Sequence, residues 1–420
     1  MKRRYGVLIV FTLLCLSIGS TAWADLSVAK PEAVGLSSER LDRIGAILKA
    51  DIEKGVIPGA VVLVARRGKS AYFESFGMSD LEAGTPMQKD SIFHIYSMTK
   101  PITSVGVMML QEEGRIFLSD GISKYIPELG ELDVGVEETD TATGQTTFST
   151  VRAEREMTIQ DLLRQTSGLT YSFFGTSKVN TMYTEAGVPS PDQSLTQMVE
   201  KLSKLPLAYQ PGTTWEYGRS TDVLGRVIEI VSGTSLDRFF EDRILRPLQM
   251  NDTGFFVKEE KLGRVAKPGP QAKWPLPDFT ALPKLLQGGQ GLVSTASDYA
   301  RFLQMLLNGG ELDGVRLLGR KTVEYMTADH LGSIPKTGPR YFVGSGRGFG
   351  LGFAVREYPG VSAVPGSVGD YSWMGAGGTS FFVSPHEELF SVFMAQPNDM
   401  AKMAHYGMLT KILVMQAIVD

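Results

Sequence analysis

The chain of 420 residues contains a single cysteine, Cys15, and only four histidines. We expect Cys15 to be removed with an N-terminal leader, which would leave a mature protein without a disulfide bond or a thiol nucleophile. His94, His330, His386 and His405 show no H-E-x-x-H or comparable spacing. These shortages argue against metal chemistry, and we expect no metal ion and no cofactor.

The sequence also has no strongly basic stretch. Lysine and arginine total 42 against 46 aspartates and glutamates, a formal net charge of −4. Loss of Lys2, Arg3 and Arg4 with the leader would lower it by three, to −7. Without a basic stripe the protein offers little to phosphate groups, so we expect no nucleic acid partner. The G-x-S-x-G elbow that presents the nucleophile of α/β-hydrolases is missing as well.

The N-terminus, MKRRYGVLIVFTLLCLSIGSTAWADLS, has the features of a signal peptide. A basic start precedes an apolar core from Val7 to Ile18, and the small residues Ala22 and Ala24 follow. An uncleaved anchor helix is the alternative, but the core is shorter than the ~20 residues that span a bilayer. We therefore expect residues 1–24 to be cleaved, and the mature protein to be periplasmic or secreted without a stable membrane anchor.

The stretch HIYSMTKPITSVGVMMLQEEGRI, from His94 to Ile116, is apolar on nearly every side of a helix and predicts a buried one. Pro101 fits only in the first turn of a helix, so the helix should begin at about Ser97, and Gly114 should end it. Lys100 then lies one turn beyond Ser97 on the same face. Burial favours loss of the proton from such an amine, which could then activate the serine hydroxyl.

This S-x-x-K spacing is weak evidence by itself. Ser27 with Lys30 and Ser333 with Lys336 repeat it, and neither pair opens a buried helix. On the residues alone, Ser97 could equally be an N-cap serine without a catalytic role.

Strand and helix patterns alternate in blocks along the chain. A hairpin is predicted for Gly59 to Asp80, and strands return in the C-terminal part, one of them over 349–355, before a closing helix from about Met400. The middle is helical, with helices predicted over 157–169 and 220–245, the latter broken at Gly233, and with a surface hairpin near Gly144. The predicted fold class is α+β: an antiparallel sheet built from both ends of the chain, flanked by helices, with an inserted helical lobe. We expect the sheet lobe at about 25–95 and 290–420 and the helical lobe at about 96–289, with Ser97 at their junction.

Several segments, in order, resemble one known group of proteins. They include GVIPGAVVLVARRGK, YSMTK, TIQDLLRQTSGL, PGTTWEYGRSTDVLG, GGQGLVSTASDYARF and YSWMGAGGTSFFVSP. Together they resemble the serine β-lactamase and penicillin-binding-protein superfamily, and most closely the family VIII carboxylesterases built on that fold. The resemblance implies a β-lactamase/transpeptidase-like fold for residues 25–420 and makes Ser97 the nucleophile and Lys100 its partner.

The resemblance also gives roles to the second motif of this superfamily, a Tyr-x-Asn loop. Tyr217 matches its tyrosine, which acts as general base and acid; the alternative is a core aromatic next to Trp215. Arg219 stands where the lactamases have an asparagine that contacts substrate. This departure puts lactam recognition in doubt, and Arg219 could instead bring a cation to the substrate.

The third motif, usually Lys-Thr-Gly, matches Trp373, Met374 and Gly375. Trp373 and Gly375 are thereby implied to contact substrate, and the backbone N–H groups of Ser97 and Ala376 to form an oxyanion hole. The esterases of this fold carry a tryptophan at the first position, as this chain does.

The sequence thus predicts an exported serine hydrolase that works through an acyl-enzyme, most readily a carboxylesterase on short-chain uncharged esters. One alternative is a class C-type β-lactamase or D-alanyl-D-alanine carboxypeptidase. Another is a non-catalytic penicillin-binding or cell-wall sensor protein. The expected partner is a small ester or lactam substrate, and the sequence predicts no oligomeric state.

Overall fold

The computed structural model describes residues 26–337 and 341–420. The predicted signal peptide, residues 1–24, lies outside this part. Within it, no helix combines the length and the apolar character needed to cross a bilayer.

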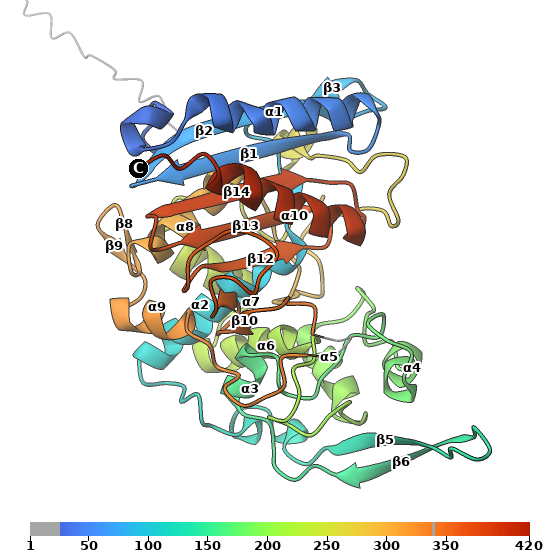
Figure 1. The fold of residues 1–420 in the computed structure, drawn as a ribbon. Helices are drawn as coiled ribbons and strands as arrows, with labels where there is room; N and C mark the ends of the chain where they lie inside the picture. Colours follow the sequence, from blue (N-terminus) through green and yellow to red (C-terminus); the bar gives the residue numbers. More distant parts are fainter. Residues whose placement is uncertain (1–25, 338–340) are drawn as a thin grey trace, which may run out of the picture.

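The central element is an antiparallel sheet of eight strands, in the order β10-β11-β12-β13-β14-β1-β2-β3. Strands from the two ends of the chain meet in its middle, where β1 pairs with β14. This confirms the predicted sheet built from both termini (Figure 1). Its strands are β1 (Gly59–Arg66), β2 (Lys69–Asp80), β3 (Thr85–Pro86), β10 (Arg347–Phe349), β11 (Ala354–Arg356), β12 (Tyr371–Gly375), β13 (Thr379–Ser384) and β14 (Leu389–Ala395).

Helices cover both faces of the sheet. The strand β1 is buried along its whole length, which explains its continuous apolar sequence GAVVLVAR. Val62 and Val64 point into a core formed with α1 (Ser38–Glu53) and α10 (Met400–Met415). The alternate residues Val61 and Leu63 point to the other face, into the core shared with α8 (Ala296–Leu307). In Figure 1 α1 and α10 lie in front of the strands.

The helical part lies below the sheet in Figure 1 and is organised around α2 (Thr99–Glu112), which packs on α6 (Ser220–Ser232). Around this pair lie α3 (Ile159–Leu163), α5 (Leu195–Leu202), α7 (Leu236–Phe240) and the π-helical turn η5 (Glu241–Leu245), whereas α4 (Lys178–Glu185) contacts the first strand of the hairpin described next. The predicted surface hairpin is confirmed: β5 (Asp133–Thr139) and β6 (Thr146–Arg152) pair and project from this part. The lobe boundaries given above stay predictions.

Short elements complete the described chain. The 3-10 turns are η1 (Pro31–Val34), η2 (Tyr96–Met98), η3 (Ile122–Lys124), η4 (Pro127–Leu129) and η6 (Glu259–Arg264), and α9 spans Arg320–Met326. Two small pairs are β4 (Phe93–His94) with β7 (Val293–Ser294) and β8 (Glu311–Leu312) with β9 (Val315–Arg316).

Element ends differ from the predicted ones in three places. The α-helix begins at Thr99 rather than Ser97, because Tyr96–Met98 form a 3-10 turn ahead of it. The helix expected over 157–169 ends at Leu163, and Gln165 follows with a positive φ of 62°. The strand expected over 349–355 is divided into β10 and β11. The predicted break at Gly233 is confirmed, since this glycine caps α6 in the left-handed conformation.

Candidate active site

Ser97 lies in the 3-10 turn η2, directly ahead of α2, and is 8 % exposed. The residue before it, Tyr96, has φ = 43°, a left-handed conformation that is unfavourable for a side chain with a Cβ. Tyr96 is held there by its neighbours: Trp274 Nε1 donates a hydrogen bond of 3.0 Å to its hydroxyl, and its ring packs on His94 at 3.7 Å. The turn that presents Ser97 is therefore strained and supported by tertiary contacts.

Lys100 reaches Ser97 as the S-x-x-K spacing predicts. Its Nζ donates to Ser97 Oγ at 3.2 Å, to the Tyr171 hydroxyl at 3.2 Å and to the carbonyl oxygen of Gly289 at 2.7 Å. The side chain is 1 % exposed. Burial lowers the pKa of Lys100 to about 7, with the charge of Asp222 opposing this shift and that of Arg219 adding to it. Near neutral pH a large share of Lys100 is thus a free amine, which can accept the serine proton.

The segment that supplies the third bond of Lys100 is fixed from three sides. The N–H of Gly289 donates to Asp222 Oδ1 at 2.9 Å, and Thr103 Oγ1 donates to the carbonyl oxygen of Gly288 at 2.6 Å. His94 Nε2 lies 2.7 Å from the carbonyl oxygen of Gln290. Burial lowers the pKa of His94 to about 3, so the ring is neutral and donates this bond through Nε2–H. The Gly289 carbonyl is therefore preorganised to orient Lys100.

Tyr217 lies next to Ser97 and Lys100. Its ring centroid is 4.4 Å from Lys100 Nζ, and Trp373 Nε1 donates a hydrogen bond of 3.2 Å to its hydroxyl. Burial raises the pKa of Tyr217 above its usual value, while hydrogen bonds with Ser97 and Trp373 partly offset this. The phenol is consequently neutral at physiological pH and able to donate a proton. This placement favours the catalytic interpretation of Tyr217 over a purely structural one.

The structure places Arg219 in a buried ion pair, and its predicted contact with substrate stays a prediction. The residue is 2 % exposed, and its Nη1 donates to Asp222 Oδ2 and to Gln287 Oε1, both at 3.1 Å. Its guanidinium lies 4.9 Å from the centre of the Tyr171 ring. The reason is electrostatic: Asp222 is fully buried on α6 and needs a counter-ion, which Arg219 at the start of the same helix provides.

The third motif lies at the end of β12, which packs against η2. A Cβ on Gly375 would be 2.2 Å from the carbonyl oxygen of Ile95, so only glycine allows this approach. A Cβ on Gly377 would similarly meet the Tyr96 ring at 2.6 Å. Ala376, between these glycines, is thereby held beside the turn of Ser97. The oxyanion-hole role of the Ser97 and Ala376 amides, and substrate contacts of Trp373 and Gly375, stay predictions.

Sequence reasoning missed Tyr171, Asp222 and Gly289. Tyr171 accepts a bond from Lys100 and packs edge-on against Tyr217 at 5.5 Å. Of these three residues, Asp222 could have been found from the sequence. It is an aspartate in the first turn of an apolar helix, and a buried aspartate requires a specific partner. Gly289 acts through its backbone carbonyl, which leaves no trace in the residue type.

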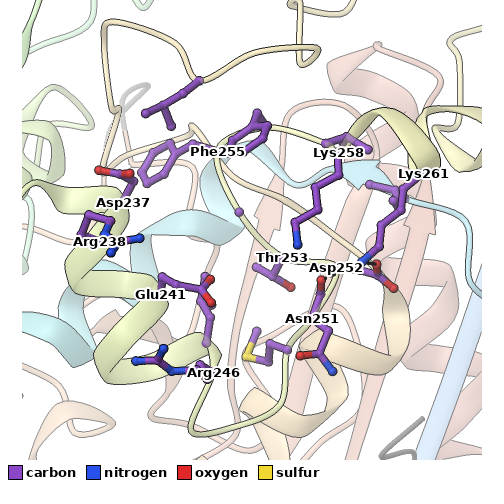
Figure 2. Close-up of a pocket in the computed structure, with 17 residues that line it drawn as sticks. Asp237, Arg238, Glu241, Arg246, Asn251, Asp252, Thr253, Phe255, Lys258 and Lys261 are labelled. Atoms are coloured by element: carbon purple, nitrogen blue, oxygen red, sulfur yellow. Dashed lines mark hydrogen bonds and ion pairs between the residues drawn. The ribbon is translucent and has the colours of Figure 1, made fainter. Parts of the chain in front are cut away.

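A separate cavity of about 420 Å³ lies between η5 and residues 250–261, and Ser97, Lys100 and Tyr217 do not line it (Figure 2). Charges of both signs surround it, among them Asp237, Arg238, Glu241 and Lys258. In the described residues, 26–337 and 341–420, no group of three or more His, Cys, Asp or Glu side chains could hold a metal ion.

The family model described as Beta-lactamase matches residues 44–408. The chain belongs to the beta-lactamase family. Protein Rv1367c of Mycobacterium tuberculosis is 35% identical over 371 residues, which are 85% of this chain and 90% of that protein. Esterase EstB of Burkholderia gladioli is 29% identical over 378 residues, which are 84% of this chain and 90% of that esterase.

Among solved structures, this beta-lactamase family chain is similar to EstCE1, described as a hydrolase with promiscuous acyltransferase activity. The TM-score is 0.75 at 25% identity, over 91% of this chain and 99% of that one. These likenesses confirm the β-lactamase/transpeptidase-like fold and the resemblance predicted from the sequence. The protein is a serine hydrolase that resembles carboxylesterases.

Proposed function

We propose that this protein is an exported carboxylesterase that hydrolyses short-chain uncharged esters through an acyl-enzyme on Ser97. The observation that carries the proposal is the buried group of Ser97, Lys100 and Tyr217, joined by hydrogen bonds. The esterase among the relatives supports the ester substrate, and the N-terminal sequence supports export.

The pKa directions suggest how the proton moves. Ser97 Oγ attacks the ester carbonyl carbon while its proton passes to the neutral amine of Lys100, 3.2 Å away. The tetrahedral intermediate collapses, the C–O bond to the alcohol breaks, and the alkoxide takes the phenol proton of Tyr217. The new ammonium on Lys100 lies 4.4 Å from the Tyr217 ring and stabilises the phenolate. The ammonium proton then returns to the phenolate, so that Lys100 is again a neutral amine and Tyr217 a neutral phenol. Water then repeats the sequence on the acyl-enzyme and releases the acid.

The charges around the nucleophile favour an uncharged substrate. The cations that contact the rings of Tyr171 and Tyr217 are Lys100 and Arg219, and both already have partners. Trp373 presents an indole whose N–H is used on Tyr217. A substrate carboxylate, as in penicillins and cephalosporins, would lose its water without gaining a permanent counter-ion here, because Arg219 is paired with Asp222 and Lys100 must be neutral to act as base.

A side-by-side assay tests the proposal. The mature protein and Ser97→Ala are incubated with a chromogenic short-chain ester and with a chromogenic cephalosporin, and a fluorophosphonate probe is mapped by peptide mass. We expect ester turnover and a single label on the peptide that contains Ser97, both abolished in the variant. Faster turnover of the cephalosporin than of the ester would support a lactamase instead. Labelling of Ser97 without turnover of either substrate would support a non-catalytic sensor protein. Export is checked by fractionating cells that express the chain with and without residues 1–24.

A further inference from the structure

The catalytic tyrosine proposed above is surrounded by aromatic rings from separate parts of the chain. Phe342 packs edge-on against Tyr217, with centroids 5.2 Å apart and an interplanar angle of 89°. Phe174 approaches the same ring at 5.7 Å and 69°, and it also contacts Phe342 at 5.4 Å. Phe173 stacks on Tyr171 at 5.0 Å and 19°. We call Tyr171, Phe173, Phe174, Tyr217, Phe342 and Trp373 the aromatic cluster.

Two members of this cluster are unusually open to solvent. Phe173 is 63 % and Phe342 is 38 % exposed, whereas Tyr171, Tyr217 and Trp373 are nearly buried. A single exposed phenylalanine needs no explanation. Here, however, the two exposed rings lie directly on the two tyrosines that contact Lys100. Apolar surface is therefore left uncovered next to the tyrosines that contact Lys100.

The geometry of the rings indicates what would cover it. Phe173 is nearly parallel to Tyr171, and Phe342 meets Tyr217 almost at a right angle, while part of each phenylalanine stays open to solvent. Offset stacking and edge-to-face contacts are the arrangements that aromatic rings prefer, and they add to the gain from burial alone. A flat ring on the substrate could extend this pattern, whereas a saturated ring of similar size would gain only from burial.

We propose that Phe173 and Phe342 form a subsite for an aromatic group of the substrate, so that esters carrying an aryl ring next to the acyl or alcohol carbon are preferred. The proposal rests on the esterase function given above and names the substrate class of the same site. It predicts a preference for aryl over cyclohexyl substituents, which are similar in bulk and differ in their π face.

The test compares kcat/KM within two substrate pairs: ethyl benzoate with ethyl cyclohexanecarboxylate, and benzyl acetate with cyclohexylmethyl acetate. Ring-specific contacts should favour the aryl ester about two- to tenfold in at least one pair, and the pair that responds identifies the side of the ester. Phe173→Leu and Phe342→Leu should reduce this ratio, and the double variant should bring it to within about twofold of unity. Phe256→Leu is the matched control, because Phe256 is 40 % exposed and lines the separate cavity of Figure 2.

No aryl preference in either pair, or a preference that survives in the double variant, would overturn the proposal. Absence of turnover for all four esters and for the chromogenic short-chain ester would instead refute the esterase function. In that event, binding of benzyl alcohol and cyclohexylmethanol to Ser97→Ala, measured by calorimetry, still decides whether the subsite exists. Tighter binding of benzyl alcohol that weakens in Phe342→Leu supports it, and equal binding overturns it.

Discussion

Acylation of Ser97 should accelerate as the pH rises through about 7, because Lys100 must be neutral to accept the serine proton. Burial lowers its pKa to about 7. With that pKa, about a tenth of the amine is neutral at pH 6 and about nine-tenths at pH 8. We therefore expect kcat/KM for an ester that does not itself titrate to increase roughly tenfold between these two pH values.

Substitutions at the Asp222–Arg219 pair should move this pH dependence in opposite directions. The Asp222 carboxylate raises the pKa of Lys100, so Asp222→Asn should lower it and shift the activity increase to lower pH. Arg219 lowers that pKa, so Arg219→Gln should shift the increase to higher pH. Glu229→Gln, on the same helix, removes a carboxylate that pairs with Arg226 away from Lys100, and serves as the control.

Folding must be measured alongside, since leaving one partner of a buried ion pair uncompensated costs about 3–5 kcal/mol. An asparagine at 222 retains an oxygen for the bond from the Gly289 N–H. The double variant Asp222→Asn/Arg219→Gln leaves no unpaired charge, and its profile should lie between those of the single variants. A profile that stays at the wild-type position in all three variants, or moves in the opposite sense, would refute Lys100 as the base.

Three further outcomes are expected. Tyr217→Phe should lower the free energy of unfolding by only about 1 kcal/mol, the value of one hydrogen bond. It should nevertheless lower kcat for the ester by at least about a hundredfold, because the proton donor is lost. Retained turnover would make Tyr217 a structural residue. Trp373→Lys should raise cephalosporin over ester kcat/KM by about tenfold or more, because a cation then meets the substrate carboxylate; an unchanged ratio contradicts the charge argument. Burial raises the pKa of Asp298 to about 7. The folded state therefore holds its proton more tightly than the unfolded chain, and chemical unfolding should show stability falling by a few kcal/mol as pH rises from about 4 to 7, a slope that Asp298→Asn removes.

Sequence periodicity predicted the layers well because burial selects residue types. The continuous apolar run of β1 and the all-round apolar α2 both correspond to elements covered on every side. The end of α2 and the break after α6 were predictable too, because glycine is the residue that most readily ends a helix. Gly114 and Gly233 indeed have positive φ values of 71° and 76°. Patterns of this kind depend on local chemistry, which a single sequence records directly.

Tertiary contacts decided what periodicity could not show. Tyr96 has the conformation of a glycine and is supported by a hydrogen bond from Trp274, which is 178 residues away in sequence. The third partner of Lys100 is a backbone carbonyl, so residue type carries no information about it. Arg219 next to Tyr217 suggested a cation for the substrate, but the pairing with Asp222 depends on the helical turn that brings the two side chains together.

Two of the departures from the lactamase motifs, Arg219 and Trp373, act on the same quantity, the charge near Lys100. Arg219 and Asp222 compensate each other, Trp373 is neutral, and Tyr217 is a neutral phenol, so the group carries no net charge when Lys100 has lost its proton. A substrate carboxylate placed against this group would stabilise the ammonium form and raise the pKa of Lys100. Such a substrate would withdraw the base that it needs for its own acylation. An uncharged ester leaves the amine free, which gives a kinetic reason for ester preference in addition to the cost of desolvating the carboxylate.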